Sequence, residues 1–519
     1  MNPGLLIIVD GWGHRDGTEG NAFRLAATPF IDDFPKRGPW TLLQASGEAV
    51  GLPGGVVGNS EIGHLTIGAG RVIEYESTRI QRAGESGELR SHPLLRPSLE
   101  RVRRRGGALH LIGLCSDGMV HADISHFRLL LEVARDSSIE RVFLHPFTDG
   151  RDVPDGSAGK YLAELEAMAA RSGRGRVASV VGRSYAMDRS GAWDRTQSAF
   201  AAIVRGEGPR VGRPSEALEA GRNAGLRDEL IPPAVVTGDD GRPLGRMSPG
   251  DLALFVNFRG DRMRQLVEAV AHPDFSRFDR GPLPGLEVQT LTEYFLDPPV
   301  PALFAQADSS DGLADLLESR GVHNVRIAES EKFQHVTFFF NGRDNRSRLT
   351  EEDVHVPSRK VDYRLAPEMS GVAVAEQTIR ALGAADAGLV LVNLANPDVV
   401  GHTGDLDAVC RAVETADACL RRMCEAAWQA GRWTAIVGDH GNAEEMVDAA
   451  TGKPNVGHTA NPVPFLLAGP GLDVRLRPDG SLADVAPTVS DLLGLDRSPR
   501  MEGEGLIRRS VLVSRDPQA

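Results

Sequence analysis

Short runs of apolar residues recur along the chain, and several of them end at a residue that can do chemistry. "LLIIVD" ends at Asp10, "GLVLVNLANPD" ends at Asp398, and "WTAIVGDHGN" contains Asp439 and His440. Uninterrupted apolar runs of about four to eight residues are typical of strands buried on both faces of a parallel sheet. We therefore expect these three segments to be strands of one sheet.

Helical patterns separate these runs. From Asp407 to Gly431, apolar positions recur at spacings of three and four, and a glycine ends the pattern. Strands that alternate with helices predict an α/β protein with a doubly wound sheet. Ligands of such sheets bind beyond the carboxyl ends of the strands, so we expect the Asp and His residues at those ends to share one edge.

A second set of apolar runs lies in the middle of the chain and ends mainly in arginine. These runs are "ALHLIGLCSDGMVH" to His121, "RVFLHPFTDGRD" to Arg151 and Asp152, "RVASVVGRS" to Arg183, and "LALFVNFRGDR" to Arg259 and Arg262. The two sets indicate two α/β domains with different tasks. We expect the second to be an insertion at residues 77–303, with the first built from residues 1–76 and 304–519. The proline-rich stretch 291–304 is the predicted return linker.

Composition excludes several classes of protein. A chain of 519 residues predicts two or more domains. A net charge of −13 argues against nucleic acid as a partner, because a phosphate backbone requires a basic face. No apolar run reaches the roughly 18 residues of a membrane span, and the start lacks the positive region of a signal peptide. Four cysteines without a CxxC pair indicate thiols, so we expect a cytoplasmic protein without a membrane partner.

Aspartates and histidines form a candidate metal constellation. A lone strand-end aspartate is usually a helix cap and a lone histidine an ordinary structural residue, but these occur in clusters. Carboxylate and imidazole mixtures suit Zn²⁺ and Mn²⁺, and six ligands serve two ions if one more group completes a shell. The six are Asp10, Asp398, His402, Asp439, His440 and His458.

Ser60 lies in the glycine-rich stretch "VVGNSEIGH" and admits three interpretations. It is a turn residue, part of a phosphate-binding loop, or a nucleophile. The lysine of a GxxxxGK[ST] loop is missing, which disfavours that kind of phosphate loop. A divalent cation would favour the serine alkoxide, and two-metal sites are common in phosphoryl transfer. On this hypothesis the neighbouring glycines let the backbone approach a phosphate closely.

The arginines of the middle segment form a candidate anion site. Arg183 and Arg189 are six residues apart, and Arg259 and Arg262 are three apart, on one face of a predicted first helical turn. Guanidinium groups match carboxylate and phosphate oxygens with paired hydrogen bonds. The alternative is a solvated charged face. Lys332 is either a point charge on a phosphate or half of a surface ion pair with Glu329 or Glu331.

Nine motifs in order give the chain a specific resemblance. It resembles the cofactor-independent (2,3-bisphosphoglycerate-independent) phosphoglycerate mutases of the alkaline phosphatase superfamily. The similarity extends from Asp10 to Pro464. The motifs are "DGWG", "GNSEIGH", "DGRD", "GRSYAMDR", "NFRGDR", "EKFQHVTFFFNG", "NPDVVGHTG", "GDHGNAE" and "HTANPVP".

The resemblance implies a two-metal phosphatase-like domain with a substrate-binding domain inserted in it. Mn²⁺ is the expected ion, with Mg²⁺, Co²⁺ or Zn²⁺ as alternatives. Asp398, His402 and His458 would bind one ion, and Asp10, Ser60, Asp439 and His440 the other. Ser60 would be the nucleophile and Asp152 a base. Substrate-binding residues would be His121, Arg151, Asp152, Arg183, Arg189, Arg259, Arg262 and Lys332.

The implied reaction is the glycolytic interconversion of 3-phosphoglycerate and 2-phosphoglycerate through a phosphoserine, without 2,3-bisphosphoglycerate, by a monomer. A phosphomonoesterase or phosphopentomutase is the nearest rival, and a non-catalytic metal- and anion-binding protein is a rival of another class. A sulfatase is disfavoured because Pro and Arg do not follow Ser60. Gly260 departs from the family pattern, where proline is frequent, and we expect it to loosen the turn that carries Arg259 and Arg262.

Overall fold

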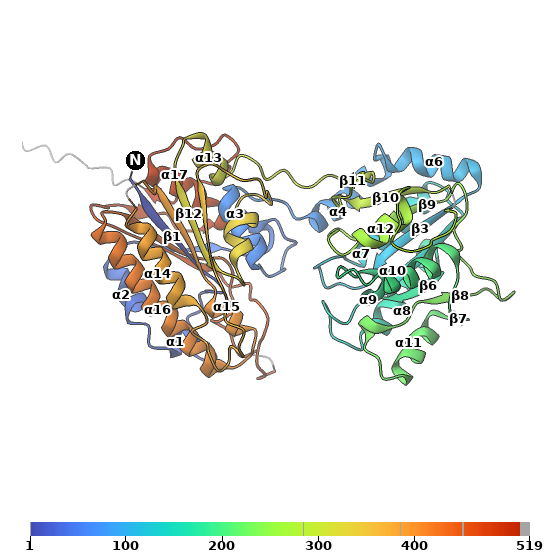
Figure 1. The fold of residues 1–519 in the computed structure, drawn as a ribbon, viewed down its shortest axis with the longest axis horizontal. Helices are drawn as coiled ribbons and strands as arrows, with labels where there is room; N and C mark the ends of the chain where they lie inside the picture. Colours follow the sequence, from blue (N-terminus) through green and yellow to red (C-terminus); the bar gives the residue numbers. More distant parts are fainter. Residues whose placement is uncertain (1, 284, 385, 449–450, 509–519) are drawn as a thin grey trace, which may run out of the picture. The chain divides into compact units, whose positions relative to one another are not determined.

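A computed structural model describes residues 2–283, 285–384, 386–448 and 451–508. The chain forms two compact units, which are coloured along the sequence in Figure 1. One consists of Met1–Glu74 and Asp308–Ala519, and we call it the discontinuous unit. The other, the inserted unit, is Tyr75–Ala307. None of the helices in the described ranges is long and apolar enough to span a membrane.

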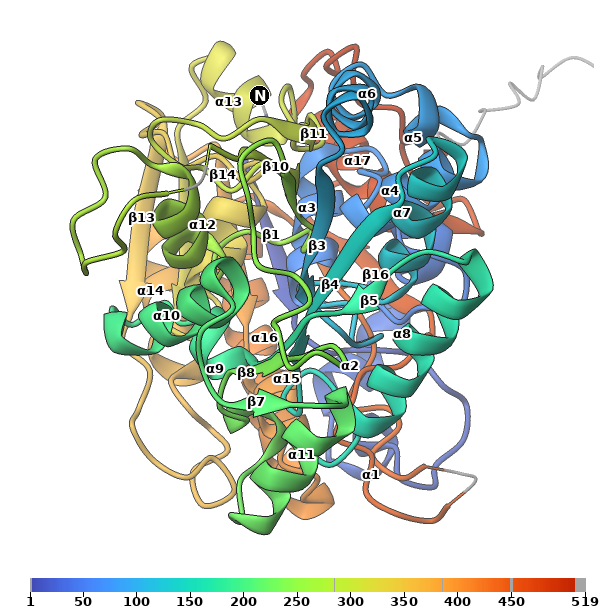
Figure 2. The same cartoon turned by 90° about the vertical axis from the view of Figure 1, so that its right-hand side faces the viewer.

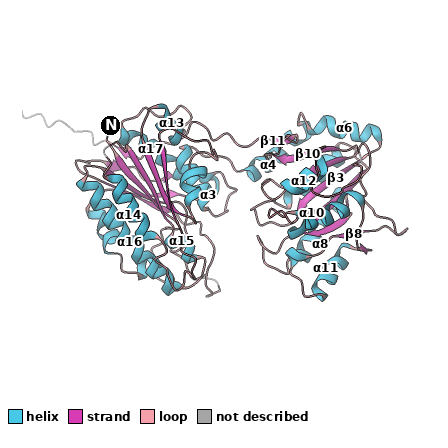
Figure 3. Cartoon of the chain, viewed as in Figure 1, coloured by secondary structure: helices cyan, strands magenta, loops and turns pink. Residues whose placement is uncertain are grey.

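The discontinuous unit is built on an eight-stranded sheet (Figure 3). Its order is β13 (Glu351–Val356), β12 (Asn324–Glu329), β14 (Leu389–Leu394), β1 (Gly4–Val9), β15 (Trp433–Gly438), β16 (Val463–Ala468), β2 (Trp40–Gln44) and β18 (Gly480–Ser481). The first five strands are parallel, and β16 is antiparallel to both of its neighbours. Every residue of β1, β14 and β15 is buried, as the apolar runs predict.

Helices cover both faces of this sheet. α14 (Gly371–Leu382) and α16 (Leu406–Gln429) pack together on one face, and α3 (Ser60–Ala69) lies on the other (Figure 1). The side chain of Asp405 caps α16 by accepting a hydrogen bond from the Ala408 amide. The remaining helices include α1 (Ala22–Leu25), α2 (Pro29–Asp33), α13 (Leu313–Ser319), α15 (Asn396–Gly401) and α17 (Val485–Leu493).

The inserted unit has its own sheet, which confirms the prediction of a second α/β layer structure. The order is β11 (Ala302–Phe304), β10 (Glu287–Thr292), β9 (Leu252–Phe255), β3 (Ala108–Leu114), β4 (Arg141–Thr148), β6 (Ser179–Gly182), β8 (Ala234–Val236) and β7 (Arg210–Val211). β5 (Arg176–Val177) pairs with β4. All pairs are parallel except β6 with β8.

Alternating side chains of β3 supply two separate cores. Leu109 and Leu111 pack with α7 (Ser125–Asp136) and α8 (Ala158–Ser172). Ile112 and Leu114 belong to the core formed with α10 (Trp193–Phe200) and α12 (Arg264–Ala271). Figure 2 shows these two helix pairs on opposite sides of β3 and β4. The other helices of eight residues or more are α4 (Glu76–Glu85), α6 (Leu95–Arg105) and α11 (Pro214–Asn223).

The predicted linker at residues 291–304 is wrong. This stretch contains the end of β10 and the whole of β11, and β11 pairs with β10 in parallel. Phe304 is buried in the core that also contains Leu109 and Leu111. The prolines mark the turn between two strands, so the chain leaves the inserted unit only after residue 307.

Candidate active site

Parallel strands of the discontinuous unit deliver reactive side chains to one edge of the sheet. Asp10 follows β1, Asp398 lies in the first turn of α15 after β14, and Asp439 and His440 follow β15. Lys332 follows β12. Because β12, β14, β1 and β15 are adjacent and parallel, their carboxyl ends meet at this edge.

Ser60 is the first residue of α3, and its hydroxyl points into this cluster. Asn59 caps the helix by accepting a hydrogen bond from the Ile62 amide at 3.0 Å. The Ser60 hydroxyl donates to Asp10 Oδ1 at 3.0 Å and lies 3.0 Å from His440 Nε2. A helix N-terminus attracts anions, so a phosphoryl group here would meet the positive end of α3.

Two of the glycines around Ser60 lie against neighbouring backbone. A Cβ on Gly58 would lie 2.1 Å from the carbonyl oxygen of Ala45, and one on Gly63 would lie 2.6 Å from that of Asp439. These two positions are therefore filled by neighbouring backbone. Gly63 thereby lets α3 pack against the strand end that carries Asp439, whereas a Cβ on Gly55 would meet no atom within 4 Å; a role of this loop in approaching a phosphate stays a prediction.

Lys332 is buried at the centre of the cluster. Its Nζ donates to Asp10 Oδ1 at 2.7 Å, to Ser60 Oγ at 2.7 Å and to Asp398 Oδ2 at 2.6 Å. Burial opposes the charge of the ammonium, but the carboxylates of Asp10, Asp398 and Asp439 outweigh it and raise the pKa of Lys332 well above its usual value. The alternative of a surface ion pair is therefore wrong.

Asp398, His402 and His458 present a donor set suited to a metal ion. Their ligand atoms all lie within 4.8 Å of one another. His402 Nδ1 donates to the carbonyl of Val456 at 2.8 Å, and His458 Nδ1 donates to that of Gly58 at 2.9 Å. When such a ring is neutral it has a lone pair on Nε2, and the two Nε2 atoms face each other at 3.2 Å. A cation between them would satisfy both lone pairs.

Asp10 belongs to two more groups whose ligand atoms lie within 4.8 Å of one another, one with His64 and Asp439 and the other with Asp398 and His440. Asp439 Oδ1 accepts the Gly11 amide at 3.1 Å, whereas its buried Oδ2 accepts no hydrogen bond among the described residues. Burial disfavours the charged imidazole of His440, but Asp439, Asp398 and a hydrogen bond with Asp10 raise its pKa to about 10. The excess of carboxylate charge thus draws positive charge to this edge, which fits a cation site.

His64 is a residue of this cluster that sequence reasoning missed. Its Nδ1 donates to the carbonyl of Ser60 at 2.9 Å and lies 3.2 Å from Asp439 Oδ2. Its Nε2 accepts from the Asn393 amide at 3.0 Å. Both ring nitrogens are engaged, so His64 positions Ser60 and Asp439 instead of offering a free ligand. The spacing of four between Ser60 and His64 on a helix was the available signal.

The inserted unit gathers its charged residues in the same way, after β3, β4, β6 and β9. Arg183 bridges two aspartates, with Nη1 at 2.6 Å from Asp149 Oδ1 and 2.7 Å from Asp152 Oδ2. Asp149 also accepts the amides of Arg151 and Asp152 at 3.0 Å and the Ser116 hydroxyl at 2.6 Å. Asp149 therefore holds the "DGRD" turn in place, a role the sequence analysis did not assign.

A second carboxylate, Asp261, orders the other arginines. Arg189 Nη1 lies 3.0 Å from its Oδ2, and Arg259 Nε lies 3.3 Å from its Oδ1. His121 Nδ1 is 3.5 Å from Oδ1. Arg259 and Arg262 lie in the turn before α12, which begins at Arg264, so the predicted placement on a helical turn is wrong.

Electrostatics divides these residues into positive and proton-accepting groups. Burial raises the pKa of Asp152; Arg183 opposes this and Asp149 adds to it. Burial also lowers the pKa of His121 to about 3, with contributions from Arg259, Arg183 and Arg262, so the imidazole is neutral near pH 7. Burial and the charges of Arg189, Arg183 and Arg151 lower the pKa of Arg262. The arginines thus raise the local positive potential around one another.

Gly260 lies against the ring of Tyr294. A Cβ at this position would lie 2.3 Å from the ring of Tyr294, whose hydroxyl donates to the carbonyl of Asn257 at 2.7 Å. This close contact explains why a residue without a side chain stands at position 260; the expectation of a loose turn stays a prediction.

Known proteins are similar to this chain over nearly its whole length. Residues 2–497 match the model of the Metalloenzyme superfamily. The chain is 44% identical over 506 residues to the 2,3-bisphosphoglycerate-independent phosphoglycerate mutase of Myxococcus xanthus, covering 97% of this chain and 98% of that protein. It is 45% identical over 507 residues to the enzyme of the same description from Desulforudis audaxviator, with coverage of 97% and 99%.

A solved structure of a related protein has the same fold. The crystal structure of Leishmania mexicana phosphoglycerate mutase at low cobalt concentration is similar with a TM-score of 0.76 and 33% sequence identity, covering 98% of both chains. The predicted α/β class is thereby confirmed. Identity above 40% over almost all of its length shows that this chain belongs to the family of 2,3-bisphosphoglycerate-independent phosphoglycerate mutases.

Proposed function

We propose that the chain interconverts 3-phosphoglycerate and 2-phosphoglycerate through a phosphoserine on Ser60. The observation that carries this proposal is the position of the Ser60 hydroxyl. It is at the N-terminus of α3, 3.0 Å from both Asp10 Oδ1 and His440 Nε2, and 2.7 Å from the Lys332 ammonium. The Ser60 hydroxyl as nucleophile, the Asp10 carboxylate that accepts its hydrogen bond and the Lys332 ammonium that would pair with a phosphate thus meet at one point.

Two divalent ions fit the donor sets of this edge. Asp398, His402 and His458 would hold one ion, and Asp10, Ser60, Asp439 and His440 the other. Mn²⁺ suits this oxygen and nitrogen mixture, with Mg²⁺, Co²⁺ and Zn²⁺ as alternatives. Bound ions of this kind lower the pKa of a coordinated hydroxyl and neutralise charge on the transferring phosphoryl group.

The residues of the chain then carry out a double transfer. Ser60 Oγ loses its proton and forms a bond to phosphorus while the bond from phosphorus to the glycerate oxygen breaks, and that oxygen takes up a proton. The other glycerate hydroxyl then gives up its proton and attacks the phosphoserine, and the released Ser60 oxygen takes up a proton again. Lys332 balances the charge of the phosphoryl group throughout.

The inserted unit would bind the glycerate part of the substrate. Arg183, Arg189, Arg259 and Arg262, with Arg151, offer planar donors for its carboxylate and phosphate oxygens. Asp152 is suited to take the proton of the attacking hydroxyl, because burial raises its pKa above that of an ordinary aspartate. His121 is neutral and would donate or accept a hydrogen bond without adding charge.

Reconstitution tests this function. Protein stripped by a chelator should regain 3-phosphoglycerate mutase activity on addition of Mn²⁺, and Ser60→Ala should reduce kcat by at least about 10³-fold, as loss of a nucleophile does. Released phosphate is measured beside 2-phosphoglycerate in the same assay. Ser46→Ala is the matched control, because Ser46 is in the same glycine-rich region and its hydroxyl, among the described residues, donates only to the carbonyl of Ala460. Release of phosphate in place of 2-phosphoglycerate would instead indicate a phosphatase.

A further inference from the structure

Glu444 is a completely buried glutamate that the proposed reaction does not use. It lies in the loop after β15, four residues beyond the candidate ligand His440. Burying a carboxylate costs free energy unless its oxygens are hydrogen-bonded, and each oxygen of Glu444 accepts two hydrogen bonds. The donors belong to three loops that carry candidate metal ligands, so we ask what this residue holds in place.

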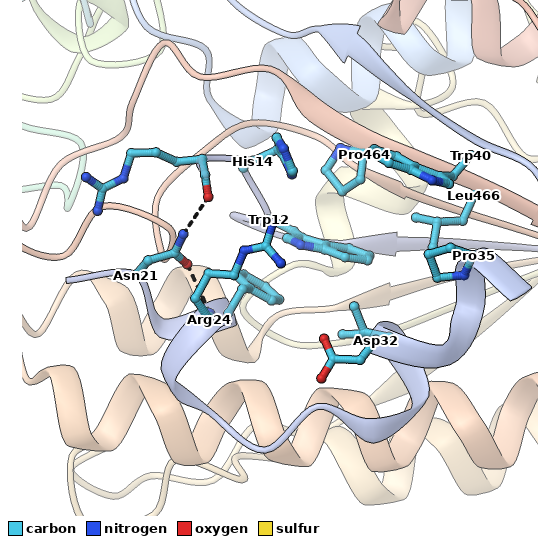
Figure 4. A pocket seen from close by; sticks show the side chains of 13 residues that line it. Trp12, His14, Asn21, Arg24, Asp32, Pro35, Trp40, Pro464 and Leu466 are labelled. Atoms are coloured by element: carbon cyan, nitrogen blue, oxygen red, sulfur yellow. Dashed lines mark hydrogen bonds between the residues drawn. The ribbon is translucent and has the colours of Figure 1, made fainter. Parts of the chain in front are cut away.

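One carboxylate oxygen binds two backbone amides. Glu444 Oε2 accepts from the Asn442 amide at 2.8 Å and from the Gly13 amide at 3.2 Å. A Cβ on Gly13 would lie 2.3 Å from the carboxyl carbon of Glu444, so this contact requires a residue without a side chain. The segment after β1 is also held by Asn21, which lines a small pocket with it (Figure 4) and donates to the Arg15 carbonyl at 2.9 Å. Glu444 is therefore fixed against a segment with its own support.

The other carboxylate oxygen reaches the loop of His458. Glu444 Oε1 accepts from the Thr459 hydroxyl, and it accepts from the side-chain amide of Asn461 at 2.9 Å. Thr459 directly follows His458, and its backbone amide donates to the carbonyl of Gly441 at 3.0 Å. Glu444 therefore joins the loop of His458 to the loop after β15 at the point where the two backbones meet.

Asn442 continues this connection to another candidate ligand. Its side-chain amide donates to Asp398 Oδ1 at 2.8 Å, and the same oxygen lies 3.3 Å from His458 Nε2. Glu444 thus holds Asn442, which orients Asp398, and it also holds Thr459, the neighbour of His458. One carboxylate fixes the positions of both ligands relative to each other.

The ligands of the other proposed ion are held by different residues. Asp10 Oδ2 accepts from the side-chain amide of Asn393 at 2.8 Å. Asp439 Oδ1 accepts from the Gly11 amide at 3.1 Å. Glu444 takes no part in either hydrogen bond, so its loss should affect the two proposed ions unequally.

We propose that Glu444 is a positioning residue that sets the affinity of one ion, which we call the first ion. This is the ion proposed for Asp398, His402 and His458. The inference rests on the two-ion site of the proposed function. Residues that hold metal ligands in place contribute about 10- to 100-fold to metal affinity, because a misplaced ligand bonds the ion poorly. Glu444 belongs to neither donor set and acts only through the residues that it holds.

Titration of the full-length, chelator-stripped protein with Mn²⁺ tests this inference, with free Mn²⁺ measured by electron paramagnetic resonance. The parent protein should bind two ions, and Glu444→Gln should weaken one of them at least about tenfold. His402→Ala removes a ligand of the first ion. In that background Glu444→Gln should change the affinity of the remaining ion less than about threefold, because the remaining ligands do not depend on Glu444.

Glu445→Gln is the matched control and should bind both ions as the parent does. It removes the same charge from the next residue, whose side chain, among the described residues, accepts only from Asn461, at 3.0 Å. Thr459→Val tests the connection to His458, because it removes the hydroxyl at nearly constant volume. It should weaken the first ion, and its effect and that of Glu444→Gln should be less than additive, since both remove one hydrogen bond.

The near-ultraviolet circular dichroism spectrum of each metal-free variant shows whether it is folded, and Thr459→Val carries the test if Glu444→Gln does not fold. Unchanged binding of both ions in Glu444→Gln would overturn the inference. Equal weakening of both ions would also overturn it, because that result marks a general structural role. These two results leave the proposed two-ion site intact, whereas a parent protein that binds fewer than two ions would contradict that site and this inference together.

Discussion

At the scale of single residues, Lys332 is the cation on which the metal-free cluster depends. Its ammonium contacts Asp10 and Asp398, both of which are buried. Lys332→Met would remove the ammonium that contacts both carboxylates, and breaking a buried pair costs about 3–5 kcal/mol. We expect the metal-free variant to lose that much free energy of unfolding in urea. Addition of Mn²⁺ should restore part of the loss, because the ion supplies positive charge.

A surface lysine provides the control for this measurement. Lys160 is 66% exposed and lies 3.7 Å from Asp117, so Lys160→Met should change the free energy of unfolding by less than about 0.5 kcal/mol. A loss of less than about 1 kcal/mol in Lys332→Met would contradict the central role given to Lys332.

At the scale of secondary-structure elements, adjacent strands of the inserted unit share a buried histidine chain. His110 of β3 bonds Asp251 at 3.3 Å and His145 of β4 at 3.0 Å, and His145 bonds Ser179 of β6 at 2.8 Å. Burial lowers the pKa of His110 and lowers that of His145 well below its usual range. The folded unit therefore keeps both rings neutral while the unfolded chain, with a pKa of about 6.5, takes up protons.

This difference gives the inserted unit a predictable acid sensitivity. Its stability should be independent of these histidines above about pH 6.5 and should fall below it, by at most about 1.4 kcal/mol per pH unit for each histidine. Urea unfolding from pH 7.5 to pH 5 measures this slope. His145→Gln cannot take up a proton and should reduce the slope by about one proton. Stability that rises on acidification, or an unchanged slope in the variant, would argue against the account.

At the scale of the whole molecule, the inserted unit has a complete sheet and cores of its own. We expect residues 75–307 to fold alone with one cooperative urea transition and a native near-ultraviolet circular dichroism spectrum. A fragment of residues 77–303 is the informative comparison, because it lacks Phe304, which is buried in the core. Loss of a buried phenylalanine costs about 3–5 kcal/mol, so this fragment should be less stable. Equal stability of the two fragments would contradict the boundaries of the inserted unit at residues 75 and 307.

The sequence identified the central strands because β1, β14 and β15 are mostly apolar, with Asn393 and Thr434 as their polar residues. It could not identify β12 in that way, because a charged residue, Arg326, interrupts the apolar pattern of this strand. In the structure Arg326 is completely buried: its guanidinium lies over the ring of Phe340 at 4.5 Å and donates a hydrogen bond to Asn324. Lys332 therefore had no strand end to mark its position. Asp149 and Asp261 were also missed, because a carboxylate that orders arginines looks like an ordinary loop residue until its partners are in place.

The central claim is that Ser60 carries the phosphoryl group during turnover, and trapping that group tests it directly. Protein reconstituted with Mn²⁺ is mixed with 3-phosphoglycerate, quenched within milliseconds and digested for mass spectrometry. The account predicts a phosphate on the peptide containing Ser60, formed and lost at rates compatible with turnover and missing in Ser60→Ala. Full mutase activity in Ser60→Ala, or turnover of the parent protein with phosphate on a different residue, would contradict it.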